Sequence, residues 1–181
     1  MRKVIVSEFV TLDGVMEAPD QWQFSFWNEE ATQYKFDELM GCDALLLGRK
    51  TYDVFAAAWP SITDETGIAD RMNSLPKYVV STTLSEVTWN ASLIKSDVVQ
   101  EISKLKQEEG RDLLIYGSGE LAHRLEQDDL IDEYRLMVHP IIVGGGQRLF
   151  SPSGKTKTFQ LDEVKTFRSG IVVLSYYPRK E

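Results

Sequence analysis

The stretch from Asp112 to Leu121 reads DLLIYGSGEL, and it predicts how this part of the chain folds. Leu113 to Tyr116 is a run of apolar residues that fits a buried strand, and Leu121 to Leu130 has the spacing of a helix. Between them lie Gly117 and Gly119. Glycines where a strand passes into a helix let the backbone approach a ligand, while the free N–H groups of the helix start point toward an anion. A phosphate would fit at this turn.

The same stretch has other interpretations. GSGELA has the form G-x-G-x-x-A, which resembles the fingerprint of Rossmann dinucleotide-binding units. That motif requires an acidic residue closing a strand about 20 residues further on, whereas Asp132 and Glu133 precede a strand. A tight turn that needs positive φ explains the two glycines equally well when they are considered alone. The choice therefore depends on the rest of the chain.

A second stretch, LLLGRKTYD, repeats the arrangement. Ala44 to Leu47 predicts a short buried strand, Gly48 lies at the turn, and helical spacing follows until a proline ends it. Arg49, Lys50 and Thr51 would lie in the first helical turn, where cations oppose the macrodipole unless an anion lies between them. An arginine fork and a hydroxyl suit phosphate, although a solvated arginine and a capping hydroxyl would also account for them.

A third predicted strand, Lys77 to Val80, ends in the hydroxyl side chains of Ser81, Thr82 and Thr83. Ligands of α/β sheets collect outside the carboxyl ends of the strands. Three strand ends thus carry groups that suit an anion. We expect them to converge on one locally positive site at a common edge of the sheet.

The rest of the chain sets the fold class. Strand-like and helix-like segments alternate up to residue 130, which predicts crossover connections and a largely parallel sheet with helices on both faces. The C-terminal third has three longer strand-like runs joined by Gly-rich or short polar turns, as in an antiparallel meander or hairpin. The predicted strands are 3–10, 44–47, 77–80, 93–95, 113–116, 132–142, 158–168 and 170–178, and the predicted helices are 29–40, 48–59, 97–109 and 121–130. We expect residues 61–75 to be irregular or partly helical, and residues 1–181 to form a single α/β domain with a mixed sheet.

Composition excludes several classes of protein. The net charge is −8 and the pI about 4.9, with no basic run, so a surface that binds nucleic acid or an acidic membrane is not expected. No stretch reaches about 18 apolar residues, which argues against a membrane span. One cysteine, Cys42, cannot form an internal disulfide, and two histidines without a Cys/His cluster predict no metal site. We therefore expect a cytoplasmic protein.

Five ordered motifs resemble those of the dihydrofolate reductase-like fold, and within it the reductase domain of the riboflavin-biosynthesis deaminase-reductase group. They are SEFVTLDGVM, LLLGRKTYD, YVVSTT, LLIYGSGEL and HPIIVGGGQRLF, in the order and spacing of that family across nearly the whole chain. The resemblance implies a three-layer fold, NADPH as cofactor, a small-molecule substrate and a homodimer. No deaminase motif H-x-E with P-C-x-x-C is present, so the partner activity of the bifunctional enzymes is not expected.

The resemblance also implies roles for individual residues. Those implied to bind the cofactor fall into four groups: the phosphate-holding helix start, the neighbourhood of the adenosine 2′-phosphate, the pyrophosphate cradle, and a mobile loop beside the nicotinamide. In that order they are Gly48, Arg49, Lys50 and Thr51; Ser81 and Thr82; Gly117, Ser118, Gly119, Glu120 and Leu121; and Thr11, Asp13 and Gly14. Candidates on the substrate side are Trp22, Glu29 and Gly145.

The chain departs from dihydrofolate reductases at one position. Those enzymes carry a carboxylate on the helix before the GR motif, and the family spacing places Ala31 to Gln33 there, none of which is an acid. Glu29 and Glu30 lie nearby but out of register by half a turn or more. The resemblance therefore favours reduction of a small heterocycle or of a ribosyl carbonyl, as in 5-amino-6-(5-phosphoribosylamino)uracil. Pterin reduction, an NADP-binding sensor and a non-catalytic dimeric module are the alternatives, and no catalytic residue is assigned.

Two further features have plain structural interpretations. His139 lies in a strand-like run beside a proline and is interpreted as a structural histidine, and His123 as a surface residue. The aromatic segment from Trp22 to Trp27 suits core or dimer packing as well as a platform on which a substrate ring stacks. Cys42 is interpreted as a small buried apolar residue.

Overall fold

The computed structural model of the chain describes residues 1–150 and 156–179. Its strands form one sheet in the order β4-β3-β2-β5-β1-β6-β8-β7. The strands are β1 (Val4–Thr11), β2 (Cys42–Gly48), β3 (Lys77–Val80), β4 (Ala91–Ile94), β5 (Asp112–Tyr116), β6 (Glu133–His139), β7 (Phe159–Thr166) and β8 (Val172–Pro178). The helices are α1 (Glu29–Gly41), α2 (Arg49–Ala58), α3 (Ile68–Ser74), α4 (Val98–Gln107) and α5 (Gly119–Gln127), with short 3₁₀ turns at Pro19–Gln21, Gln23–Phe26 and Trp59–Ser61.

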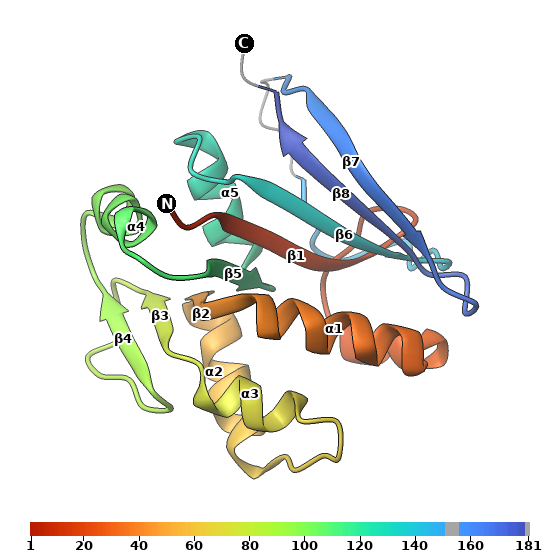
Figure 1. Cartoon of the computed structure of the whole chain (residues 1–181), viewed down its shortest axis with the longest axis horizontal. Coiled ribbons are helices and arrows are strands. Elements are labelled where there is room, and N and C mark those ends of the chain that lie inside the picture. Colours follow the sequence, from red (N-terminus) through yellow and green to blue (C-terminus); the bar gives the residue numbers. More distant parts are fainter. Residues whose placement is uncertain (151–155, 180–181) are drawn as a thin grey trace.

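Helices cover both faces of the sheet, as the alternating sequence predicts. Figure 1 shows α1, α2 and α3 on one face and α4 and α5 on the other. The central strand β1 serves both layers, because successive side chains of a strand point to opposite faces. Val4 and Val6 pack with Leu125 of α5, and Ile5 packs with Leu39 of α1. The core is therefore divided into two layers by the sheet.

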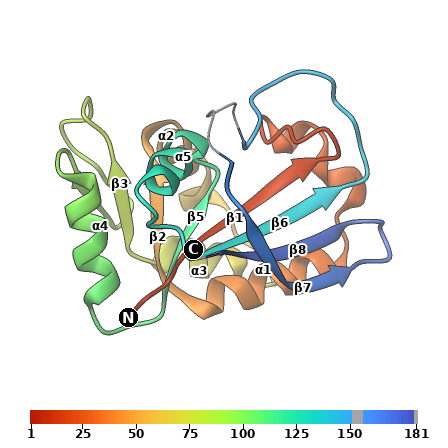
Figure 2. The same ribbon diagram turned by 90° about the horizontal axis from the view of Figure 1, so that it is seen from above.

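The sheet is parallel except for one strand. β1, β2, β3, β4, β5 and β6 pair in parallel, and β8 runs antiparallel to both β6 and β7. The predicted hairpin of β7 and β8 is confirmed, but β8 and not β7 lies beside β6, so a consecutive meander is wrong (Figure 2). The reason is burial: Val173 of β8 packs with Met137 and Ala31, whereas most of β7 is exposed and suits an edge.

Several boundaries differ from the sequence-based ones. α5 begins at Gly119, two residues earlier than the apolar spacing indicates. β6 ends at His139 rather than residue 142, since Pro140 has no N–H for a ladder. The helix α3 lies within the segment expected to be irregular or partly helical. The helical spacing of residues 29–40 also predicts a buried Met40, but this side chain is 42% exposed. Cys42 is a buried free thiol, as predicted.

Among the residues that the structure describes, no helix combines the length and the apolar character that crossing a bilayer requires. The same residues include no group of three His, Cys, Asp or Glu side chains placed to hold a metal ion.

Candidate active site

The three predicted strand ends lie at one edge of the sheet. β3, β2 and β5 are neighbours and parallel, so the residues that follow them meet at the carboxyl edge. Gly48 ends β2, Ser81 follows β3 and Gly117 follows β5. The topology confirms that these three strand ends share one edge of the sheet.

Two of these turns are joined directly. The Gly48 N–H donates to Ser118 Oγ at 2.9 Å, and the Ser118 N–H donates to Thr51 Oγ1, also at 2.9 Å. Ser118 Oγ itself donates to the Tyr116 carbonyl at 3.1 Å. We call the segments Gly48–Thr51 and Gly117–Leu121 the paired helix starts. The hydroxyls of Thr51 and Ser118, predicted as ligand groups, hold the two segments together.

The paired helix starts leave backbone donors without side-chain caps. Neither α2 nor α5 has a side-chain hydrogen bond at its N-cap, and the first amides of a helix have no acceptor within the helix. At α1, in contrast, Asn28 Oδ1 accepts from the Ala31 N–H at 3.0 Å, and two glutamates lie in the first turn. Helix starts without caps suit an anion. α4 also begins without a side-chain cap, but the starts of α2 and α5 are joined by hydrogen bonds, so these two are the candidates and α1 is not.

Gly117 is required by its surroundings. Its φ is +57°, and a Cβ at this position would lie 2.9 Å from Thr51 Oγ1, which the Ser118 amide holds in place. At Gly119, a Cβ would lie 2.7 Å from Sδ of Met16, in the loop after β1. Both glycines therefore serve close packing, and Gly117 also supplies a left-handed conformation.

The cations at this edge have carboxylate partners. Arg49 pairs with Asp53 one turn along α2 at 3.1 Å, and Lys50 pairs with Glu120 of α5 at 3.0 Å, both on the exposed surface. Exposed pairs of this kind contribute about 0 to 1 kcal/mol, so Arg49 can leave Asp53 at little cost. The positive charges expected near a phosphate are therefore present, but in this conformation each of them is paired with a carboxylate.

The remaining predicted cofactor residues are placed differently. Ser81 is buried, and its Oγ accepts from the N–H groups of Thr83 and Leu84 at 3.2 and 3.1 Å. Thr82 is exposed at the same turn. Leu121 is buried in the layer between the sheet and α5. Ser81 thus shapes the turn, and Thr82 offers an accessible hydroxyl.

The loop after β1 is fastened to the glycine-rich loop after β6. Asp13 accepts from Thr11 Oγ1 at 2.6 Å and from the Gly144 N–H at 2.9 Å, and these hydrogen bonds lower its pKa to about 2. The Leu149 N–H donates to the Gly14 carbonyl at 3.1 Å. Thr11 and Asp13 therefore connect two loops, whereas the resemblance implies a mobile loop beside a nicotinamide.

A hollow of about 290 Å³ lies between the start of α5 and residues 147–150 of the loop after β6. The residues that line it are Gly119, Glu120, His123, Gln147, Arg148, Leu149 and Phe150. Sequence reasoning missed Arg148, which adds an exposed guanidinium next to the start of α5. The signal was present in the motif HPIIVGGGQRLF, which places an arginine directly after the glycines.

The three candidates on the substrate side do not form one cluster of contacts. Trp22 is buried, and its Nε1 donates to the Glu17 carbonyl at 3.1 Å. Its ring lies edge-on to His139, with 5.0 Å between the centroids. Glu29 is exposed in the first turn of α1, and Gly145 is exposed with open space beside it. In this conformation Trp22 packs against the protein instead of offering an open platform.

His139 is fully buried at the end of β6. Its Nδ1 donates to the Met137 carbonyl at 2.9 Å, while its Nε2 has no partner among the described residues. Burial lowers the pKa of His139, so the ring is neutral at pH 7. The rings of Phe9, Trp22 and Phe26 surround it edge-on. Its surroundings agree with a structural histidine that has one unsatisfied nitrogen.

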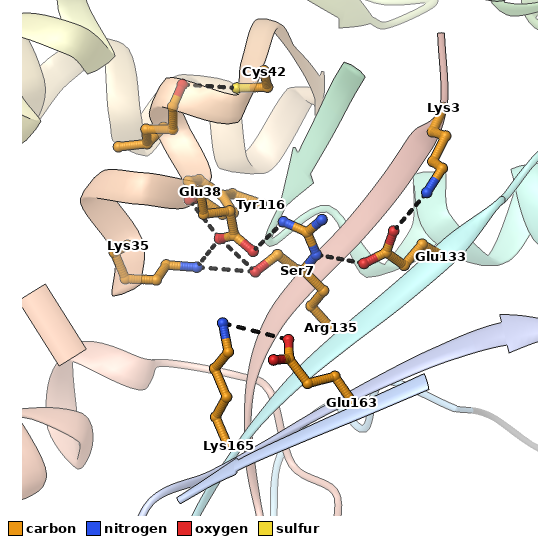
Figure 3. Close-up of polar contacts among 11 residues, drawn as sticks. Lys3, Ser7, Lys35, Glu38, Cys42, Tyr116, Glu133, Arg135, Glu163 and Lys165 are labelled. Atoms are coloured by element: carbon orange, nitrogen blue, oxygen red, sulfur yellow. Dashed lines mark hydrogen bonds and ion pairs between the residues drawn. The ribbon is translucent and has the colours of Figure 1, made fainter. Parts of the chain in front are cut away.

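A buried ionic network lies between β1 and α1 (Figure 3). Glu38 Oε2 accepts from Lys35 Nζ at 2.6 Å, from Ser7 Oγ at 2.8 Å and from Tyr116 Oη at 2.8 Å. Glu38 Oε1 pairs with Arg135 at 3.4 Å. Burial alone would raise the pKa of Glu38, but Lys35, Arg135 and the Tyr116 hydroxyl together lower it. This glutamate is therefore an anion with every partner it needs.

Glu8 is another buried glutamate, and it is not among the residues predicted from the sequence. It is 4% exposed, and its Oε2 accepts from the Gly117 N–H at 3.1 Å. Its Oε1 is buried and has no hydrogen-bond partner in the part of the chain that the structure describes. Burial raises its pKa well above the usual value, against the attraction of Lys35 and the Gly117 amide. A charged residue inside the run VIVSEFV was the signal that could have identified it.

These features define a class of protein. The topology is that of a dihydrofolate reductase-like α/β fold, and dihydrofolate reductase from Enterococcus faecalis, solved with NADP(H), has a TM-score of 0.66 at 11% identity, covering 98% of this chain and 97% of that one. The chain belongs to the RibD C-terminal domain family, whose sequence profile matches residues 2–173.

Relatives and neighbours agree with this assignment. The Bacillus subtilis (strain 168) protein YyaP is 30% identical over 179 residues, which cover 97% of this chain and 95% of YyaP. A Shewanella sp. PV-4 protein assigned to riboflavin biosynthesis has a TM-score of 0.80 at 25% identity, covering 98% and 99% of the two chains. The deaminase/5-amino-6-(5-phosphoribosylamino)uracil reductase of Thermotoga maritima has a TM-score of 0.68 at 15% identity, and the match covers 57% of its length.

Proposed function

We propose that this protein is an NADPH-dependent reductase that transfers hydride to a small heterocyclic or ribosyl-carbonyl substrate. The family and the fold are those of reductases. The observation that carries the proposal is the pair of helix starts without side-chain caps, joined by Gly48, Thr51 and Ser118 at the carboxyl edge of the sheet. Such a pair offers backbone donors to two phosphate groups of one ligand.

The residues present fit a phosphorylated dinucleotide. The first amides of α2 and α5 would bind its phosphates, and the turn at Gly117 has no space for a side chain. Arg49 and Thr82 lie at the neighbouring strand ends, where a 2′-phosphate would require a cation and a hydroxyl. Arg148 adds positive charge at the hollow beside α5. We expect these residues to bind the cofactor, with Gly48, Ser118 and Gly119 shaping the backbone.

When bound, NADPH supplies the hydride, and the chain supplies orientation and the exclusion of water. Residues 147–150 of the loop after β6 close one side of the hollow, and the buried ring of Trp22 packs against His139 at the end of β6. A carbonyl or imine reduced by hydride also takes up a proton. No residue is assigned to the proton transfer. Dihydrofolate reductases carry a carboxylate at the position that corresponds to residues 31–33 here, and Ala31 is buried among apolar side chains.

Pterin reduction is less well supported than reduction of a riboflavin-type intermediate. The buried acid of α1, Glu38, is held by Lys35, Ser7 and Tyr116 and has no free oxygen for a pterin. Glu30 accepts from the Arg168 N–H at 2.8 Å, and Glu29 is exposed. A substrate such as 5-amino-6-(5-phosphoribosylamino)uracil fits the family assignment. We also expect a homodimer in the cytoplasm, which gel filtration and cell fractionation test.

The first experiment measures binding of NADPH by fluorescence titration, for the wild type and for Gly117→Ala. A Cβ at Gly117 must displace Thr51 and adopt positive φ, so we expect Gly117→Ala to weaken NADPH binding at least about tenfold. Gly145→Ala is the matched control, because a Cβ at Gly145 meets nothing within 4 Å. Equal affinities for the two variants would contradict the proposed site.

The second experiment tests the 2′-phosphate. Arg49→Ala should weaken NADPH more than NADH, by about 1–3 kcal/mol, because only NADPH offers the extra phosphate to the guanidinium. Arg124→Ala is the control, since Arg124 forms a similar exposed pair with Asp128 on α5. An equal loss for both dinucleotides would exclude this role of Arg49.

Turnover is then measured with a panel of pyrimidine, pterin and aldehyde substrates. Consumption of NADPH with the ribosyl pyrimidine supports the proposal. Stoichiometric binding without consumption would favour an NADP-binding sensor, and the absence of binding would favour a non-catalytic dimeric module.

A further inference from the structure

Glu8 is a buried acid at the ligand-binding turn that the proposed function leaves unused. It belongs to the carboxyl half of the central strand β1, and its neighbour Ser7 points to the α1 face, so Glu8 points to the face of α4 and α5. Its Oε2 reaches the Gly117 amide at 3.1 Å, which places the carboxyl group directly behind the paired helix starts. The strand holds it in this position through its pairing with Leu136 of β6.

The second oxygen of this carboxyl group has no partner. Glu8 Oε1 is buried without a hydrogen bond to any residue that the structure describes, although the residue is only 4% exposed. Buried polar atoms are nearly always paired, so an unpaired one requires an explanation. At a candidate ligand site, a partner supplied by the ligand is such an explanation. The nearest functional feature is the Gly117 turn, to which the other oxygen is already bonded.

Burial of the Glu8 carboxyl group outweighs the charges that act on it. From α1, Lys35 attracts and Glu38 repels the carboxyl group. Lys35 donates to Glu38 at 2.6 Å and to Ser7 at 2.9 Å, and its ammonium lies 4.1 Å from the centre of the Tyr116 ring. The cation is therefore committed to the α1 network, and Glu8 retains only the Gly117 amide. A second anion on the paired helix starts would repel a carboxylate at this position further.

We propose that Glu8 is a binding residue of this site and works as an uncharged acid: Oε2 accepts from the Gly117 amide, and the Oε1 hydroxyl donates to an acceptor oxygen of the bound dinucleotide. The inference rests on the proposed function, because it takes NADPH as the ligand. A proton is thus part of the binding site. Deprotonation of Glu8 removes the donor and adds a negative charge beside the phosphates, and it weakens binding for both reasons.

The experiment measures the dissociation constant of NADPH from about pH 7 to about pH 10 for the wild type and for Glu8→Gln. The phosphates of the ligand do not titrate in this range, since their second pKa is about 6. Above the pKa of Glu8, the wild-type Kd should rise roughly tenfold for each pH unit. Glu8→Gln keeps an acceptor and a donor without a titrating proton, so its Kd should stay within about threefold of the wild-type value at pH 7 throughout.

Glu101→Gln is the matched control. Glu101 lies in the first turn of α4 and forms an exposed pair with Lys104, so this variant should keep the pH dependence of the wild type. A Glu8→Gln Kd that rises with pH as the wild-type Kd does overturns the inference. A wild-type Kd that does not change with pH overturns it when the infrared measurement described next finds a carboxylate at Glu8. Absence of NADPH binding at every pH overturns the proposed function together with the inference.

A second measurement does not need the ligand. The infrared difference spectrum between wild type and Glu8→Gln at pH 7 should contain the C=O stretch of a protonated carboxylic acid. A carboxylate band in its place overturns the inference, whatever the binding experiment gives. Glu38→Gln provides the opposite case, because the difference spectrum for that variant should contain a carboxylate band.

Discussion

Two buried glutamates lie on opposite faces of the same part of the sheet, and they are in opposite states. Glu38 of α1 has three donors on one oxygen and Arg135 on the other (Figure 3). Glu8 of β1 has one backbone donor and one oxygen without a partner. The pKa of Glu38 is lowered and that of Glu8 is raised, although burial acts on both in the same direction.

The difference shows that burial alone does not decide the charge of an acid. Desolvation disfavours the anion at both positions, and only the number and charge of the hydrogen-bond donors differ. On the α1 face, both oxygens of Glu38 have partners, and the network stabilises the fold because each of its polar groups depends on the others. On the α5 face, Glu8 Oε1 has no hydrogen-bond partner among the described residues, and we infer that a bound ligand supplies it. Three changes can break or sharpen this comparison.

The largest effect is expected for Glu38→Ala. It leaves the ammonium of Lys35 buried without its anion, and breaking a buried pair on one side costs about 3–5 kcal/mol of unfolding free energy. Urea denaturation measures it. The double variant Lys35→Met with Glu38→Leu removes both charges and should cost much less than the single variant. A single variant as stable as the double one would show that the network is not the coupled unit described.

Tyr116→Phe should have the next largest effect. It removes one hydroxyl donor, 2.8 Å from Glu38 Oε2, while the ring stays in the core. Hydrogen bonds to charged groups contribute about 1.5–3 kcal/mol, and urea denaturation should give a loss in that range. Tyr52→Phe is a suitable reference, since its hydroxyl bonds to the uncharged backbone of Thr88 and should cost less. Equal losses for both variants would argue against a charged Glu38.

The third test compares how the two acids link stability to pH. The pKa of Glu8 in the folded state lies above its unfolded value of about 4.3, so wild type should lose stability relative to Glu8→Gln as pH rises from there to the folded pKa. The pKa of Glu38 lies below about 4.3, so its contribution is complete above that pH and is lost as pH falls through the folded pKa. Either slope is at most about 1.4 kcal/mol per pH unit.

Urea midpoints between about pH 3 and about pH 9, for the wild type and the two glutamine variants, give both slopes. Slopes of the same sign would remove the contrast between the two glutamates. A flat difference for Glu8→Gln would mean that Glu8 is as well solvated in the folded chain as in the unfolded one.

Local patterns predicted a large part of the site. The runs before Gly48, Ser81 and Gly117 were identified as strands, and the parallel arrangement brought their ends to one edge. The cap at Asn28 and the hairpin of β7 and β8 follow from short-range signals in the same way. The patterns did not reveal that Thr51 and Ser118 bond to the neighbouring segment's backbone, since these partners lie 67 and 70 residues apart in sequence. The patterns also did not show that β8 lies between β6 and β7 in the sheet, with β7 at the edge.

What the sequence determined by itself is the order of strands and helices and the positions of the turns, because hydrophobic periodicity, glycine and proline act within a few residues. Tertiary structure decided which of these turns touch, and which buried carboxyl group carries a proton. A single glutamate in VIVSEFV looks the same whether four donors or one will surround it. The charge of Glu8 depends on the Gly117 amide, which follows β5, and on Lys35 of α1, and these groups come together only when the sheet has formed.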